Sequence, residues 1–188
     1  MLAAREDLVD QVSELSSRRG LTLFGVTNDA LEHILKLDKM GVRQGEVVRE
    51  YEVSRATRDS GFVPIPEMLL YEVMDRAYVE NRDWMMKKWN ECGEWCGKYC
   101  SVKGFGSDLG ELEKYLKGFL WNANDFDLIQ GSPNDVFVKC VSPRFSESYV
   151  SFLGAFLEGL FSALGYELAQ KDLSKGILEL QFRIAKKV

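Results

Sequence analysis

The stretch VKCVSPRFSESYVSFLGAFLEGLFSALGYE, residues 138–167, decides the fold. It begins at the end of a run of alternating apolar residues, continues through a Ser-Pro turn and then shows the clearest helical pattern of the chain. The apolar residues of that pattern recur at the spacing of one wide helix face. They are Tyr149, Phe152, Leu153, Phe156, Leu157, Leu160, Phe161 and Leu164. We therefore predict a strongly amphipathic helix that ends at Gly165.

Short β-type runs flank this helix on both sides. Residues 126–130 and 135–141 precede it and are separated by Gly-Ser-Pro-Asn, a sequence that suits a hairpin turn. Residues 166–171 and 177–185 follow it. The order β-β-α-β-β is most simply packed as an antiparallel sheet with the long helix laid on one face. The predicted fold class is α+β, with N-terminal helices ahead of this sheet.

The N-terminal part has helical patterns with recognisable ends. One helix stops at Gly20, a second begins at Thr22 or Thr27, and a third, residues 46–59, is closed by Gly61. We expect residues 1–62 to form a helical segment that could dimerise. Residues 63–188 would then be a ligand-binding α+β domain, with its sheet unit at 121–188.

Further helices are expected between the prolines at positions 64 and 66 and the sheet. They cover residues 67–77 and about 80–102, and a last one begins at Ser107 or Asp108 and runs to Leu120. The second of them holds most of the Trp and three of the four Cys residues.

Composition and charge restrict the function classes. The net charge of −5 argues against the general basic field that nonspecific nucleic-acid binding uses. No run approaches the length of a membrane span, and the first residues lack the pattern of an export signal, so we expect a cytoplasmic protein without a membrane segment. His33 is the only histidine, which excludes a His-pair metal site and a Ser-His-Asp triad within one chain. A noncatalytic protein is favoured over an enzyme, and no cofactor is identified.

Three cysteines, Cys92, Cys96 and Cys100, stand four residues apart along one predicted helix. At about 1.5 Å rise per residue, the outer two are too far apart for all three to hold one metal. The metal candidates are therefore Cys92, Cys96 and Cys140 of the predicted sheet, with Cys100 able to replace Cys92. The alternative is a stripe of small buried residues, interleaved with glycine, that allows a close helix contact.

The same helix is the most aromatic part of the chain and suggests a ligand pocket. Pockets for small molecules are lined by aromatic and adaptable side chains with few polar groups. Our candidate ligand-binding residues are Trp89, Trp95, Cys96, Tyr99, Phe152 and Phe156. The alternative is that these side chains form an ordinary hydrophobic core.

Residues 138–167 and the hairpin after them resemble the C-terminal half of the 4-vinyl reductase-type domain. That resemblance implies a small-molecule-binding fold, shared with haem nitric-oxide sensors and with subunits of the TRAPP transport complex. This chain lacks cysteines in its last hairpin, and Tyr51-Glu-Val-Ser-Arg differs in spacing from the Tyr-x-Ser-x-Arg motif of the haem branch. The resemblance therefore implies neither the family's metal site nor haem.

ELSSRRGLTLFGVTNDALEHIL, residues 14–35, resembles the two-helix half of ribbon-helix-helix DNA-binding proteins. Such a pair could dimerise, or place Arg18 and Arg19 on phosphates. It could equally be a plain helical hairpin. Our leading hypothesis is a noncatalytic small-molecule-binding or regulatory module with an apolar pocket, forming a homodimer. The alternative is a DNA-binding transcriptional regulator.

Overall fold

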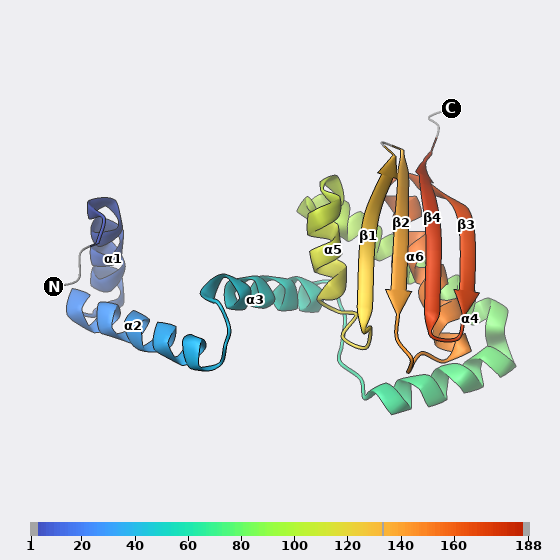
Figure 1. Cartoon of the computed structure of the whole chain (residues 1–188), viewed down its shortest axis with the longest axis horizontal. Coiled ribbons are helices and arrows are strands. Elements are labelled where there is room, and N and C mark those ends of the chain that lie inside the picture. Colours follow the sequence, from blue (N-terminus) through green and yellow to red (C-terminus); the bar gives the residue numbers. More distant parts are fainter. Residues whose placement is uncertain (1–3, 133, 186–188) are drawn as a thin grey trace. The chain divides into compact units, whose positions relative to one another are not determined.

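The computed structural model describes residues 4–132 and 134–185. The chain divides into two compact units, Met1–Tyr51 and Glu52–Val188. Its fold is of the α+β class, with helices in both units and the strands in the second (Figure 1). Within the described residues, no helix is long and apolar enough to cross a membrane.

The first unit contains two helices with locally encoded ends. Helix α1 (Glu6–Arg19) stops at Gly20, which adopts the left-handed conformation with φ 67°. Helix α2 (Leu23–Lys39) begins at Thr22, whose hydroxyl accepts a hydrogen bond from the Gly25 amide at 3.0 Å. None of the residues of α2, all of which the structure describes, is buried. Helix α3 (Gln44–Asp59) begins in this unit and ends in the second.

The second unit contains one antiparallel sheet of four strands in the order β1-β2-β4-β3. Strands β1 (Asp125–Ser132) and β2 (Asp135–Val141) form the first hairpin, and β3 (Tyr166–Ser174) and β4 (Ile177–Ile184) form the second. The two hairpins join through β2 and β4, where Val138 is paired with Leu180. This arrangement confirms the predicted antiparallel sheet.

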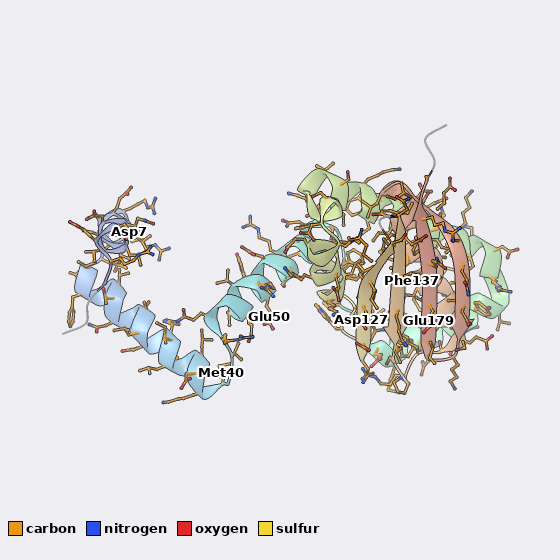
Figure 2. The ribbon with its side chains drawn as sticks, turned by 45° about the horizontal axis from the view of Figure 1, so that its top comes forward. Asp7, Met40, Glu50, Asp127, Phe137 and Glu179 are labelled. Atoms are coloured by element: carbon orange, nitrogen blue, oxygen red, sulfur yellow. The ribbon has the colours of Figure 1, made fainter. Side chains whose placement is uncertain are left out.

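Helix α6 (Glu147–Ala163) covers one face of this sheet (Figure 1). The sheet side chains on that face are apolar and buried, and they include Val136, Val138, Cys140, Leu178 and Leu180. The other face is open: Figure 2 shows Asp127, Phe137 and Glu179 on it. Buried and exposed side chains alternate along each strand because successive side chains of a strand point to opposite faces of the sheet.

Helix α4 (Glu67–Lys103) packs on the side of α6 that faces away from the sheet. It consists of two helices joined across a kink at Asn81, whose φ of −146° and ψ of 42° are not helical. The sequence predicted two helices there, with the break a few residues earlier. Helix α6 is thus covered by the sheet and by α4, which explains why 13 of its 17 residues are buried.

The contact between α4 and α6 is made through glycines. A methyl group on Gly93 would lie 1.9 Å from the carbonyl oxygen of Phe156, and one on Gly97 would lie 2.4 Å from that of Leu160. Such distances leave no room for a side chain. The alternative reading of this segment, a close helix contact through small residues, is therefore confirmed at Gly93 and Gly97, whereas Cys92 lies outside the contact and is exposed. Helix α5 (Leu109–Lys117) is capped by Asp108, one of its two predicted starts; it follows a short 3-10 turn, η1 (Phe105–Ser107), and contacts strand β1.

Candidate functional site

A cavity of about 590 Å³ lies in the second unit. This volume falls in the range of roughly 300–1,000 Å³ that is usual for small-molecule sites. The wall comes from the last turns of α3, the connection from α3 to α4, both halves of α4, the segment after α5, the loop before α6, and α6 itself. The lining residues are Ser54, Thr57, Arg58, Phe62, Val63, Pro64, Ile65, Glu67, Leu70, Trp89, Phe119, Leu120, Trp121, Asn122, Arg144, Tyr149, Leu153 and Phe156.

Aromatic rings form much of this wall. Phe62 stacks on Phe119 with ring centroids 4.4 Å apart, and both rings meet Phe156 edge to face at 6.1 and 6.0 Å. Trp89 approaches Phe156 and Tyr149 edge to face at 6.4 and 6.5 Å. Edge-to-face and offset pairs of this kind stabilise aromatic clusters. The cluster gives the cavity a rigid apolar surface.

Polar groups in the wall are joined to one another. The Glu67 carboxylate accepts a hydrogen bond from the Tyr71 hydroxyl at 2.8 Å and pairs with the Arg144 guanidinium at 3.2 Å. The Asn122 amide donates to the Tyr71 hydroxyl and its carbonyl oxygen accepts from the Tyr149 hydroxyl, both at 3.2 Å. The Arg144 guanidinium also donates to the main-chain carbonyl of Asn122 at 3.4 Å. These bonds tie α4, α6 and two loops together.

Both tyrosines of this network stay protonated at neutral pH. Burial raises the pKa of Tyr149 well above its usual range. Burial and the hydrogen bond donated to Glu67 raise the pKa of Tyr71 in the same direction. The two hydroxyls therefore act as neutral hydrogen-bond donors, and neither is prepared to serve as a general base or a nucleophile.

The structure brings some of the predicted ligand-binding residues together and separates others. Trp89 and Phe156 line the cavity, and Phe152 lies directly behind Trp89, stacked on it at 5.9 Å. Trp95 lies outside the lining, is 51% exposed and stacks on Tyr99 at 5.7 Å.

Cys96 is buried in the core, with its sulfur 3.8 Å from the hydroxyl of Tyr115. That hydroxyl shares a hydrogen bond of 2.7 Å with the hydroxyl of Ser60, and the Ser60 O–H donates to the carbonyl oxygen of Thr57. Tyr99 donates to the Ala56 carbonyl at 3.4 Å. Cys96 and Tyr99, two of the predicted ligand-binding residues, therefore lie outside the cavity lining. Tyr99 contacts the C-terminal part of α3, and Cys96 contacts the tyrosine that is bonded to Ser60, the residue after α3.

The cysteine metal candidates do not form a cluster. Cys92 is exposed on α4, whereas Cys96, Cys100 and Cys140 are buried. In the parts of the chain that the structure describes, no group of three His, Cys, Asp or Glu side chains could hold a metal ion. Each of the three buried thiols occupies the space of a small apolar residue in the core.

The candidate nucleic-acid residues Arg18 and Arg19 lie in the last turn of α1. Cations at that place are favourable for the helix itself, because they face the negative end of its dipole. Ala4 and Arg5, the described residues before α1, are not in a strand; residues 1–3 lie outside the described residues. His33 lies on α2 in the first unit, with its Nδ1 2.7 Å from the carbonyl oxygen of Asp29.

Sequence patterns missed most of the cavity wall, because much of it lies in connections between helices. Phe62, Phe119, Asn122 and Arg144 lie outside α-helices and strands. No periodicity marks such positions. The sequence signals that could have pointed to these wall residues are local. Phe62 lies between Gly61 and Pro64, and Arg144 lies between a proline and a phenylalanine just before the long helix.

No protein-family model matches the chain, and no curated protein matches its sequence. Solved H-NOX structures do match at low identity. One, described as "Probing the function of heme distortion in the H-NOX family", is 14% identical, with a TM-score of 0.41 over 74% of this chain and 87% of its own. An oxygen-binding H-NOX domain related to soluble guanylate cyclases is 14% identical, with a TM-score of 0.38 over 73% and 86%. With TM-scores this low, the matches say nothing of what this chain binds.

The cavity of this chain does not fit a haem. Haem iron is held by His, Cys, Met or Tyr side chains. Among the described residues that line the cavity there is no His, Cys or Met. The one tyrosine, Tyr149, donates its hydroxyl to Asn122, and burial raises its pKa, which disfavours the tyrosinate that would bind iron.

Proposed function

We propose that this chain is a noncatalytic regulatory module that binds a small molecule with an apolar body in the cavity of the second unit. The observation that carries the proposal is the cavity of about 590 Å³ with its aromatic wall. The polar side chains of Glu67, Asn122, Arg144 and Tyr149 in its wall belong to one bonded network, which suits a binding site better than a catalytic one. The nucleic-acid alternative has no comparable observation in its favour.

A regulatory role is supported by the course of α3. The last turns of this helix contribute Ser54, Thr57 and Arg58 to the cavity wall, and the helix begins at Gln44 in the first unit. A ligand that contacts these turns would stabilise the C-terminal end of α3, whose N-terminal end belongs to the first unit. The predicted division between a dimerising N-terminal segment, residues 1–62, and a ligand-binding domain, residues 63–188, stays part of this proposal with its boundary moved to Tyr51/Glu52, because residues 54–62 contribute to the cavity wall.

Homodimer formation through the first unit belongs to the same proposal. Helix α2 exposes large apolar side chains, among them Phe24 at 79% and Leu35 at 62%. Exposed apolar residues gathered on a helix pair are typical of a protein interface. A second copy of the chain would cover them with the same surface, as in most soluble oligomers.

Binding in the cavity is tested with a neutral fluorescent probe, N-phenylnaphthylamine, and a matched pair of variants. Leu70 lines the cavity, whereas its neighbour Leu69 does not and is 49% exposed. Leu70→Trp would fill part of the cavity, and we expect it to weaken probe binding by roughly tenfold, since about 1.4 kcal/mol of contact free energy would be lost. Leu69→Trp should leave the affinity unchanged.

Circular dichroism is the control for folding: the binding results are compared once both variants show the helical content of the wild-type chain. Weaker binding by Leu70→Trp alone supports the cavity as the site. Equal affinities for wild type, Leu70→Trp and Leu69→Trp, or no binding of the neutral probe by the wild-type chain, would refute the proposed function.

A further inference from the structure

We infer that the ligand carries an anionic group, as in an organic carboxylate or sulfonate, on its apolar body. This inference rests on the proposed function. It concerns the charge of the lining, which includes two cations and one anion: Arg58, Arg144 and Glu67. The lining therefore has an excess of positive charge, although the chain as a whole has a net charge of −5.

The single carboxylate of the lining is already neutralised. Glu67 accepts the Tyr71 hydroxyl at 2.8 Å and pairs with Arg144 at 3.2 Å. Its partner Arg144 is held in turn by the Asn122 carbonyl at 3.4 Å. A cationic ligand would have to displace Arg144 from Glu67 to find a counter-charge. The lining is therefore unsuited to cations.

Arg58 supplies the excess positive charge. It lies on α3 next to Asp59, but that carboxylate lies 3.9 Å from the Arg55 guanidinium on the same helix. Across residues 4–132 and 134–185, no ion pair is formed by Arg58. A guanidinium can donate two parallel hydrogen bonds to a carboxylate or sulfonate, and such charge-assisted bonds are about twice as strong as neutral ones.

The geometry thus combines an aromatic wall with the guanidinium of Arg58, which lines the cavity and forms no ion pair within the described residues. The apolar body of the ligand would lie against Phe62, Phe119 and Phe156, which are in mutual contact, and its acidic group would lie at Arg58. An aromatic acid and a fatty acid share this chemistry. Because Arg58 is exposed, its contribution should fall as salt is added.

The test compares two probes that differ only in charge. N-phenylnaphthylamine is neutral, and anilinonaphthalenesulfonate is the same ring system with a sulfonate. Three variants of the full chain are used: Arg58→Gln, Arg58→Lys as the charge-conserving variant, and Arg55→Gln as a control on the same helix that does not line the cavity. Benzoate and dodecanoate compete with the sulfonate probe, to distinguish aromatic acids from fatty acids.

We expect Arg58→Gln to raise the Kd of the sulfonate probe by roughly tenfold at low salt, as loss of one charge-assisted hydrogen bond predicts. Its Kd for the neutral probe should not change, Arg58→Lys should restore part of the loss, and Arg55→Gln should behave as wild type. If the neutral probe binds but Arg58→Gln leaves the sulfonate affinity unchanged, the inference is wrong and the proposed function stands. If the neutral probe does not bind to the wild-type chain, both this inference and the proposed function are wrong.

Discussion

Gly93 of α4 lies against the main chain of Phe156 in α6, so closely that a methyl group in place of its hydrogen would lie 1.9 Å from the Phe156 carbonyl oxygen. The reciprocal contact exists at Gly159, where a methyl group would lie 2.0 Å from the carbonyl oxygen of Asn90. The side chain of Phe156 lines the cavity. The position of the cavity wall therefore depends on a helix crossing that only glycine permits.

Substitution of Gly93 by Ala should destabilise the second unit by about 3 kcal/mol, because a backbone carbonyl cannot move aside as a side chain can. Urea unfolding followed by Trp fluorescence measures this change. All four tryptophans of the chain, at positions 84, 89, 95 and 121, belong to the second unit, so the signal reports that unit alone.

The control for this prediction is Met68→Ala, on the same helix and in the same unit. Met68 is 77% exposed, so its truncation removes no core contact. We expect this variant to change the free energy of unfolding by less than about 0.5 kcal/mol. Equal unfolding midpoints for Gly93→Ala and wild type would show that α4 and α6 do not cross as described.

The four cysteines should differ sharply in reactivity. Cys92 is exposed, whereas Cys96, Cys100 and Cys140 each have a relative exposure of 0%. Burial also raises the pKa of Cys140 to about 12, so little thiolate forms there at neutral pH. An aromatic disulfide reagent should therefore react rapidly with one thiol of the native chain and with four after unfolding in guanidinium.

The variant Cys92→Ser tests whether Cys92 is the thiol that reacts rapidly. This variant should show no rapid reaction when folded and three thiols when unfolded. Rapid modification of a second cysteine in the folded wild-type chain would mean that the core around Cys96 or Cys140 opens more readily than the structure predicts.

Asp135 should contribute to stability in a pH-dependent way. Its carboxylate accepts from the Ser132 hydroxyl at 2.7 Å and from the Arg183 guanidinium at 2.9 Å, and these bonds lower its pKa below the ordinary value of 3.8. Because the pKa is lower in the folded state, the stabilisation is fully present above pH 3.8. It is lost as the pH falls through the lowered pKa.

The measurement is the difference in free energy of unfolding between wild type and Asp135→Asn across the acid range. We expect a constant difference at neutral pH that shrinks on acidification below 3.8. A difference that stays constant at every pH would show that the carboxylate charge contributes nothing to the turn between β1 and β2.

The oligomeric state should depend on the exposed apolar residues of α2. Light scattering after gel filtration is expected to give a mass of twice 21.4 kDa for the wild-type chain. Leu35→Ser should return the mass to 21.4 kDa, because it removes an exposed leucine from the proposed interface. Lys36→Ser, one residue further along α2, should remain a dimer. A monomeric wild-type chain would contradict the proposed dimer.

The sequence predicted the fold well wherever the signal is local. Gly20 ends the first helix as predicted, and Thr22 and Asp108, each one of two expected starts, cap later helices, because each residue satisfies the helix terminus with its own backbone or side chain. Strand β3 was predicted too short at 166–171. It extends to Ser174 because pairing with β4, a nonlocal interaction, stabilises its polar, largely exposed second half.

The candidate site was predicted only in part. Trp89 and Phe156 line the cavity, but Trp95, six residues after Trp89, is about 120° away around the helix at 3.6 residues per turn and lies outside the lining. Aromatic composition alone does not show which face of a helix is turned inward. The cations of the lining could not be predicted, since Arg58 and Arg144 reach it from segments far apart in the sequence.

Methyl-resolved NMR during titration with N-phenylnaphthylamine locates the bound probe residue by residue. Binding in the cavity should shift the methyl signals of Leu70 and Leu153, which line it, while those of Leu178 and Leu180, buried beneath α6 at the sheet, stay in place. Shifts confined to exposed leucines of α2, such as Leu35, or no shifts at all, would contradict a ligand site in the cavity.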